Sequence, residues 1–227
     1  MTCAVYFNLD DTLTEMTRDF EEIYHDAVEQ AGLDELEDRY EDYTDRFFDH
    51  FNDGYAFPRR QAIEQLSRDE DCFDPDKVED FAEAWDDLES DATELKDGAE
   101  QLLDSLDDYR LGILSNGTGE LQQKKLEKTG IADYFDSVLI SGKEGYRKPE
   151  KAFYQLAMDG SKGGIDADTH VMVSDKLKRD VIPAKKAGFE GVWIYSGDKE
   201  VPDKLRKQVS VVKDFDGAKE AIDRLCS

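Results

Sequence analysis

Short apolar runs recur along this chain, and segments with helical periodicity separate most of them. Such runs between helical segments predict buried β-strands. They lie at residues 3–7, 111–114, 137–140, 170–173, 191–195 and, more weakly, 209–212. Apolar residues three or four apart predict helices at 98–106, 120–129, 149–158, 180–187 and 214–225. Because strands that alternate with helices form parallel sheets, this pattern predicts an α/β fold with a Rossmann-like parallel sheet.

Residues 15–94 break this alternation. They contain no convincing strand, and apolar residues recur at helical spacing over 20–31, 36–51, 59–66 and 75–88. The simplest interpretation is an inserted α-helical cap that follows the first strand. We therefore expect a sheet domain of residues 1–14 plus 95–227 and a helical cap of residues 15–94.

The chain is strongly acidic. Its 227 residues include 29 Lys and Arg but 55 Asp and Glu, which gives a formal net charge of −26. Such a surface repels phosphates, which excludes nucleic-acid binding through a basic surface and disfavours docking to anionic membranes. A hydrophobic content of 39% is too high for a disordered acidic protein. We interpret the surface as halophilic, of haloarchaeal type. The alternative is an ordinary acidic cytosolic protein, and the salt dependence of folding separates the two.

The three cysteines, Cys3, Cys72 and Cys226, are too few and too scattered to predict a disulfide framework or a metal-binding knuckle. Cys3 and Cys72 lie beside apolar residues, so we expect them to fill the core. The first residues lack the features of a signal peptide, and no apolar run reaches the roughly 18 residues of a transmembrane helix. These features favour a cytoplasmic location.

Four polar clusters lie near the ends of the predicted strands, at 8–13, 115–118, 147–149 and 174–180. Open parallel sheets bind ligands at the carboxyl ends of their strands, so clusters far apart in sequence can meet at one edge. Taken singly, each cluster is also explained as a turn, a helix cap or a solvated loop. Their common position beyond strands favours a shared site.

Together the clusters resemble the motifs of the haloacid dehalogenase superfamily of hydrolases, in the type whose cap is inserted after the first motif. The resemblance rests on NLDDTL at 8–13, LSNGT at 114–118, GYRKPEKAF at 145–153 and SDKLKRDVIPAKKAGF at 174–189. It covers essentially the whole sheet domain, whereas the cap resembles the family only in position and helical character.

The resemblance implies roles for the first and last clusters. Position 8, here Asn8, corresponds to the nucleophilic aspartate, and Asp10 corresponds to the general acid and base. A Mg²⁺ ion would be held by Asn8, by the Asp10 carbonyl and by Asp175. Mg²⁺ prefers oxygen ligands of this kind. Asp180 corresponds to a second acid that supports the metal or orients the lysine.

The other two clusters correspond to the phosphate-binding residues of the family. Ser115, Asn116 and Lys148 would bind the phosphoryl oxygens, and Lys148 would also stabilise charge on the nucleophile. These roles imply phosphoryl transfer through an aspartyl-phosphate intermediate.

Asp10 distinguishes between two branches of the superfamily. An alkoxide leaving group needs a proton, whereas a halide does not, and the dehalogenases of the superfamily lack both this carboxylate and the metal. Asp10 with Asp175 therefore favours a Mg²⁺-dependent phosphatase over a 2-haloacid dehalogenase. Because a cap screens the site from bulk solvent, we expect the partner to be a small phosphorylated metabolite.

Asn8 departs from the family pattern, since an amide is a poor nucleophile. Three explanations stay open: an Asp-to-Asn change made to trap substrate, a natural non-catalytic relative that binds a phosphorylated ligand, or catalysis by another group or after deamidation of Asn8. As written, the chain is expected to turn over very poorly. Ser174 stands where Gly is usual, and Lys176 stands where a small hydroxyl residue is common. Lys176 either adds charge beside the metal or, as we expect, points to solvent.

Within the cap, Arg59 and Arg60 either bind a substrate carboxylate or second phosphate, or form ion pairs with cap acids, which is the simpler interpretation. The other cap candidates for facing the site are Tyr43, Arg46, Phe47, His50 and Tyr55.

Overall fold

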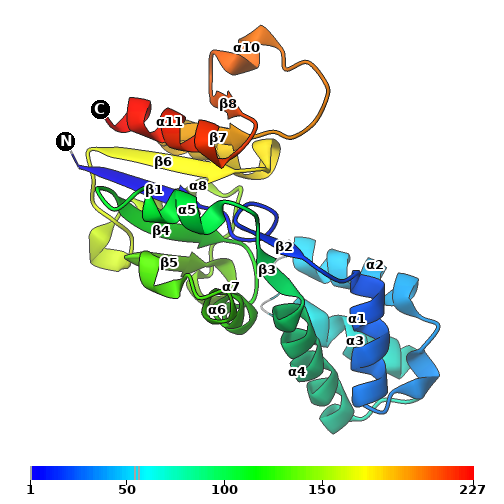
Figure 1. Ribbon diagram of the computed structural model, residues 1–227. Coiled ribbons are helices and arrows are strands. Elements are labelled where there is room, and N and C mark those ends of the chain that lie inside the picture. The colour runs from blue at the N-terminus through cyan, green and yellow to red at the C-terminus, as the bar shows by residue number, and fades with distance from the viewer. Residues whose placement is uncertain (1, 54, 56) are drawn as a thin grey trace. The chain divides into compact units, whose positions relative to one another are not determined.

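The computed structural model describes residues 2–53, 55 and 57–227, and its largest element is a six-stranded sheet (Figure 1). The strands lie in the order β5-β4-β1-β6-β7-β8, and neighbouring strands run parallel. Their bounds are β1 Cys3–Phe7, β4 Arg110–Ser115, β5 Ser137–Ile140, β6 Thr169–Ser174, β7 Glu190–Ile194 and β8 Ser210–Val212. Each apolar run of the sequence forms one of these strands, so the predicted parallel α/β fold is confirmed.

The register of the sheet brings the ends of three strands to one level. Phe7, the last residue of β1, pairs with Ile113 of β4 on one side and with Val173 of β6 on the other. The main-chain N–H of Asn8 extends the pairing by donating to the Val173 carbonyl at 3.1 Å. Polar residues at the carboxyl ends of β1, β4 and β6 therefore emerge at one edge of the sheet.

Helices cover both faces of the sheet: α5 and α11 lie in front of it in Figure 1, and α8 lies behind it. The helices of this part are α5 Ala99–Asp104, α7 Ser141–Glu144, α8 Lys151–Ala157, α9 Ile182–Ala187, α10 Asp203–Arg206 and α11 Phe215–Cys226. Two 3₁₀ turns, Ala132–Tyr134 and Gly160–Lys162, and a short π-helix, Leu177–Val181, complete it. Buried Tyr6, Phe153 and Phe189 belong to one apolar cluster that joins the sheet to its helices.

Gly112 of β4 lies against the ring of Tyr6 in β1. A Cβ atom at residue 112 would lie 2.3 Å from Tyr6 Cε1. The ring cannot move aside, because Tyr6 is fully buried and its hydroxyl donates to the Ala157 carbonyl at 2.7 Å. We expect Gly112→Ala to lower the free energy of unfolding by about 1–3 kcal/mol, the usual cost of overpacking a core. Urea unfolding measures this change. A cost that stays the same in a Tyr6→Leu background would contradict the explanation.

A disulfide bond joins Cys3 at the start of β1 to Cys226 at the end of α11, with 5.6 Å between the Cα atoms. Cys3 is buried in the core as expected, but the expectation of no disulfide is wrong. The two residues are 223 positions apart, and only the return of α11 to the sheet brings them together. Cys72 is a free thiol and half-buried. Because disulfides are rare in reducing compartments, the cytoplasmic location stays a prediction.

The chain divides into two compact units. The sheet unit consists of Met1–Glu15, Glu94–Gly119 and Thr129–Ser227, and the helical unit consists of Met16–Thr93 and Glu120–Lys128. The helices of the helical unit are α1 Phe20–Gln30, α2 Tyr40–Asn52, α3 Pro58–Asp69, α4 Pro75–Asp91 and most of α6 Gly119–Lys128, with a 3₁₀ turn at Asp34–Leu36. Two short strands that the periodicity did not predict, β2 Thr14–Met16 and β3 Thr93–Leu95, pair with each other. Across the described part of the chain, no helix is long and apolar enough to cross a membrane.

A buried ionic cluster joins α3, α4 and α6 inside the helical unit. The Glu89 carboxylate accepts from Arg59, from Lys125 at 2.6 Å and from the Trp85 indole at 2.7 Å. The Arg59 guanidinium also lies over the Trp85 ring, 4.6 Å from its centroid. Because these cations hold Glu89 ionised, its pKa falls to about 2 in spite of burial. The cluster explains why α6 groups with the helical unit.

The cap residues that were predicted to face the site contact other side chains of the helical unit. Arg59 binds Glu89, and Arg60 binds Glu79 at 2.7 Å, so both arginines form ion pairs with acids of their own unit. Arg46 binds Asp69 at 2.8 Å. The others have partners too: Tyr43 and Phe47 stack on each other, and the His50 ring contacts both Gln65 and Tyr55.

Asp86 lies at the edge of this cluster, 3.9 Å from Arg59, and its side chain is 16% exposed. Burial raises its pKa from 3.8 to about 6, although Arg59 opposes the shift. A carboxyl whose pKa is raised by folding costs stability as pH rises from its unfolded pKa, here 3.8, to its folded pKa, here about 6, and the full cost is present above that. We expect Asp86→Asn to raise the free energy of unfolding by about 2 kcal/mol at neutral pH and by nearly nothing below about pH 4. Urea unfolding of both proteins across this range measures the difference. A gain of equal size at both ends of the range would contradict the explanation.

Candidate active site

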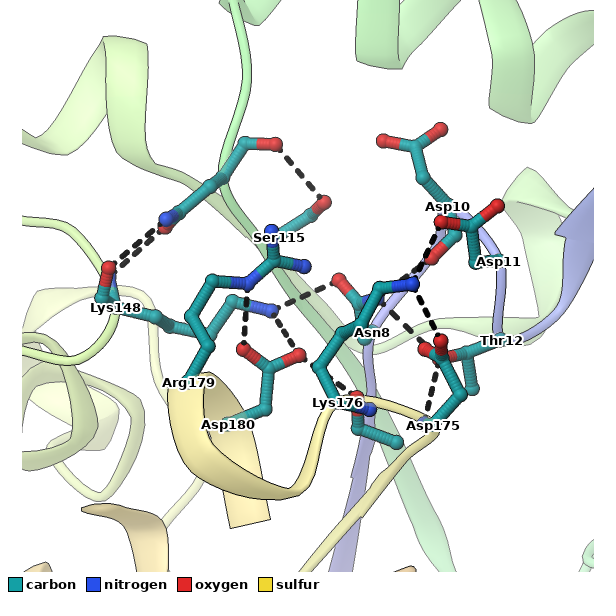
Figure 2. A network of polar contacts seen from close by, with 12 residues as sticks. Asn8, Asp10, Asp11, Thr12, Ser115, Lys148, Asp175, Lys176, Arg179 and Asp180 are labelled. Atoms are coloured by element: carbon teal, nitrogen blue, oxygen red, sulfur yellow. Dashed lines mark hydrogen bonds and ion pairs between the residues drawn. The ribbon is translucent and has the colours of Figure 1, made fainter. Parts of the chain in front are cut away.

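Loops from distant parts of the sequence meet at the carboxyl edge of the sheet, all within the sheet unit (Figure 2). Asn8 follows β1 and is 1% exposed, Ser115 ends β4 and is fully buried, and Asp175 follows β6. Lys148 comes from the loop before α8. The parallel strand order explains this meeting, because it places these loops side by side.

The Lys148 ammonium lies at the centre of the site. Its Nζ is 2.8 Å from Asn8 Oδ1 and 3.1 Å from Asp180 Oδ2, and the side chains of Lys148 and Asp180 are fully buried. Burial lowers the pKa of Lys148 to about 8, although Asp180 acts in the opposite direction. An ammonium can only donate, so the Asn8 atom that faces it is the oxygen. The Asn8 amide nitrogen therefore faces away from Lys148.

Asp180 is fixed from three directions. Besides Lys148, it accepts from the Ser174 hydroxyl at 2.7 Å and from Arg179 Nε at 3.1 Å. Burial alone would raise the pKa of Asp180, but Lys148 and Arg179 outweigh it and hold the pKa below its ordinary value. An ionised Asp180 thus orients the buried lysine toward position 8.

The Asn116 side chain is bonded to the main chain of Lys148. Its Nδ2 donates to the Lys148 carbonyl at 2.9 Å, and its Oδ1 accepts from the Lys148 N–H at 2.8 Å. This paired contact positions Lys148 relative to the end of β4. Direct phosphate contacts by Ser115 and Asn116 stay predictions.

The amide nitrogen of Asn8 is bonded within its own loop. It donates to the Asp10 carbonyl at 2.7 Å and to the Thr12 hydroxyl at 3.3 Å. Thr12 in turn donates to Asp175 Oδ1 at 2.8 Å and accepts from the Asp175 N–H at 3.2 Å. Thr12 thus ties the first motif to the last.

The expectation that Lys176 simply points to solvent is wrong, because its ammonium is ion-paired, although 37% of the side chain is exposed. Its Nζ lies 2.7 Å from Asp175 Oδ2 and 2.9 Å from Asp11 Oδ2, and Figure 2 shows the ammonium between these two carboxylates. Burial acts to lower the pKa of Lys176, but the two carboxylates outweigh it and raise the pKa. The two carboxylates thus hold the ammonium at a partly exposed edge of the site.

Sequence reasoning missed four residues of this network: Asp11, Thr12, Ser174 and Arg179. Thr12 belongs to the NLDDTL motif, so its position was a usable signal. Ser174 stood out only as a departure from Gly, yet its hydroxyl bonds Asp180 and accepts from the Lys176 N–H at 3.0 Å. Arg179 carried no signal beyond its place next to Asp180.

The hydrogen-bond network already uses several of the oxygen atoms that were predicted to bind Mg²⁺. Asn8, Asp10 and Asp175 offer oxygen atoms, the donor type that Mg²⁺ prefers. However, the Asp10 carbonyl already accepts from the Asn8 amide, and the two Asp175 oxygens already bind Thr12 and Lys176. Within residues 2–53, 55 and 57–227, no group of three or more His, Cys, Asp or Glu side chains is placed to hold a metal ion. In this arrangement the donors do not fit a divalent cation.

Comparison with known proteins agrees with the motifs. Residues 5–194 match the model of the haloacid dehalogenase-like hydrolase family. The chain belongs to this family. The resemblance inferred from the four motifs is thereby confirmed.

Relatives within the haloacid dehalogenase-like family include phosphatases. The pyrimidine 5'-nucleotidase YjjG of Escherichia coli (strain K12) is 35% identical over 107 residues, which are 47% of this chain and 47% of that protein. The glyceraldehyde 3-phosphate phosphatase of Pyrococcus abyssi is 28% identical over 210 residues, which are 87% of this chain and 83% of that protein. The chain thus aligns with about half of the nucleotidase and with most of the archaeal phosphatase.

Solved structures of the family share the fold. A 2-haloacid dehalogenase from Pseudomonas syringae pv. Tomato DC3000 matches with a TM-score of 0.72 and 22% identity over 99% of each chain. The HAD-hydrolase YfnB from Bacillus subtilis, bound to magnesium, matches with a TM-score of 0.66 and 18% identity over 98% of this chain and 99% of that one. At these identities the likeness concerns the fold alone.

Proposed function

We propose that the chain carries a phosphatase-type site of the haloacid dehalogenase-like family, that this site binds a small phosphorylated metabolite, and that Asn8 leaves turnover impaired. The observation that carries the proposal is the buried Lys148 ammonium, fixed by Asp180 and aimed at position 8 at 2.8 Å. A buried cation at the end of β1 suits a phosphoryl group, whose negative charge it offsets. The phosphatase relatives add support.

Each site residue has a proposed role in binding or chemistry. Ser115, Asn116 and Lys148 bind the phosphoryl oxygens, and Asp180 orients Lys148. Asp10 protonates the leaving alkoxide and afterwards removes a proton from the attacking water. A halide needs no such proton, so the carboxylate at position 10 favours a phosphatase over a dehalogenase.

A carboxylate at position 8 would complete the chemistry. It would attack phosphorus and form an aspartyl-phosphate, which water then hydrolyses. With the Asp10 carbonyl and Asp175 it would also complete an oxygen set for Mg²⁺, which would offset charge on the phosphoryl group. Asn8 cannot attack, because its amide oxygen is a weak nucleophile. It does not complete the oxygen set either, because that oxygen faces Lys148 and the nitrogen beside the Asp10 carbonyl carries hydrogens.

A natural non-catalytic relative that binds a phosphorylated ligand is the second candidate. Its support is that Asn8 forms a complete set of hydrogen bonds with Lys148, Asp10 and Thr12, as a residue adapted to this place would. The sheet edge would then bind the ligand without cleaving it.

The test measures hydrolysis by this chain and by Asn8→Asp, with and without Mg²⁺. The panel contains glyceraldehyde 3-phosphate, pyrimidine nucleotides, phosphoserine and a 2-haloacid. Activity of Asn8→Asp on a phosphate ester, only with Mg²⁺, supports the phosphatase. A folded Asn8→Asp variant that binds inorganic phosphate but cleaves nothing supports the non-catalytic relative. Halide release without metal would overturn both in favour of a dehalogenase.

A further inference from the structure

Two nitrogen groups of this chain contact oxygen atoms that the family resemblance assigns to a divalent cation. The Asn8 amide nitrogen is 2.7 Å from the Asp10 carbonyl oxygen, and Lys176 Nζ is 2.7 Å from Asp175 Oδ2. These two oxygens are the fixed donors that a metal at this edge of the sheet would share. Both departures from the family pattern, Asn8 and Lys176, therefore engage oxygens of the same predicted ligand set.

We propose that Asn8 and Lys176 together take the place of the divalent cation, so that this site binds a phosphoryl group without Mg²⁺. The inference rests on the proposed function, because it takes a phosphoryl group as the ligand. It concerns how the ligand is bound and does not require that the ligand be hydrolysed.

The contact at position 8 supports the first half of the proposal. A carboxylate oxygen in the place of Asn8 Nδ2 would face the Asp10 carbonyl oxygen at 2.7 Å. Two acceptors at this separation repel each other unless a cation lies beside both. The amide removes that need, because its own N–H donates to the carbonyl. The orientation of the amide is not free, since the Lys148 ammonium holds its oxygen on the other side.

The contacts of Lys176 support the second half. Its ammonium is shared by Asp175 and Asp11, at 2.7 and 2.9 Å, and the main-chain N–H of Lys176 is fixed by the Ser174 hydroxyl. Thr12 occupies the other oxygen of Asp175. A divalent cation at Asp175 would have to displace the ammonium or lie beside it, and two positive groups repel at such distances.

The charge of the site leads to the same conclusion. With an aspartate at position 8 and a neutral residue at 176, five carboxylates, at 8, 10, 11, 175 and 180, would face only the two cations Lys148 and Arg179. A divalent cation would offset most of this surplus of three negative charges. Asn8 removes one of these charges, and Lys176 adds a positive charge. The surplus falls from three negative charges to one, and Lys148 and Lys176 are the ammonium groups that can donate to a phosphoryl group.

Calorimetric binding of inorganic phosphate and of Mg²⁺ tests the proposal. The proteins are this chain, Asn8→Asp, Lys176→Met and the double variant, with Lys178→Met as the matched control. Lys178 lies two residues from Lys176 and is exposed, so its loss removes the same charge without touching the site. Urea unfolding establishes that every variant is folded.

We expect this chain to bind phosphate with the same affinity in EDTA and in Mg²⁺. Lys176→Met should weaken phosphate binding about tenfold or more, the effect of losing a charge-assisted hydrogen bond, while Lys178→Met should not change it. The double variant should bind Mg²⁺ about tenfold or more tightly than this chain does, because it regains the carboxylate and loses the competing ammonium.

Three results would overturn the inference: phosphate binding by this chain that depends on Mg²⁺, equal phosphate affinities for Lys176→Met and Lys178→Met, or Mg²⁺ binding by this chain as tight as by the double variant. These readouts do not involve turnover. A double variant that binds Mg²⁺ but hydrolyses no ester would therefore refute the proposed phosphatase and leave this inference intact.

Discussion

Asn8→Asp is expected to raise phosphatase turnover in the presence of Mg²⁺ by about 10³-fold or more. Loss of the nucleophile in other covalent enzymes lowers the rate by a factor on the order of 10⁶. Restoring the nucleophile can therefore raise the turnover rate by a large factor. The substitution is nearly isosteric, and Lys148 already lies 2.8 Å from the oxygen that would attack. The gain in rate should stay below this full factor, because the Lys176 ammonium is still paired with the Asp175 carboxylate.

Steady-state hydrolysis of the phosphate-ester panel measures this gain, and intact-protein mass spectrometry detects an aspartyl-phosphate as added mass on the Asn8→Asp variant only. Asn8→Ala is the matched control and should stay inactive, since it removes the amide without supplying a carboxylate. Adding Asp10→Asn to the active variant should remove most of the gain, because the leaving alkoxide loses its proton donor. A folded Asn8→Asp variant that is as slow as this chain would contradict the role of position 8.

Lys148→Met is expected to lower the free energy of unfolding by about 3 kcal/mol. The side chains of Lys148 and Asp180 are both fully buried, so removal of the ammonium leaves a carboxylate in the core without its main counter-charge. Arg179 and Ser174 still bond Asp180, which keeps the expected loss near the lower end for a broken buried ion pair. The same variant should lose phosphate binding.

Urea unfolding at constant KCl measures the stability change. Asp180→Asn in the Lys148→Met background should recover part of the lost stability, because the double variant no longer buries an unpaired charge. Phosphate binding should not return with it, since the ammonium is still missing. If the double variant were no more stable than Lys148→Met, the loss would come from packing rather than from the unpaired carboxylate.

The strands and the place of the site follow from local patterns. Apolar runs such as 3–7 and 137–140 became strands because burial on both faces requires continuous apolar residues. Polar clusters after β1, β4 and β6 then had to meet, since parallel strands share one carboxyl edge. For this reason positions 8, 115 and 175 could be assigned to one edge without coordinates.

The contacts inside the site could not be assigned in this way. Lys176 resembled a solvated lysine, but it lies between Asp11 and Asp175. Asn116 was expected beside phosphate, and its side chain fixes the main chain of Lys148. Cys3 forms a disulfide with a cysteine 223 positions away in the sequence. Helix α6 packs with the helical unit through the ion pair between Lys125 and Glu89.

The sequence by itself determined the six strands of the main sheet, because continuous apolar runs mark strands buried on both faces, and it indicated the helices through apolar residues three or four positions apart. The short strands β2 and β3 carried no such signal. The motifs determined the family, because they preserve residue types at fixed spacings. Only the tertiary structure decided which donor faces which acceptor at the sheet edge. That choice depends on charges and hydrogen-bond partners brought together from residues far apart in the chain, and no local pattern records it.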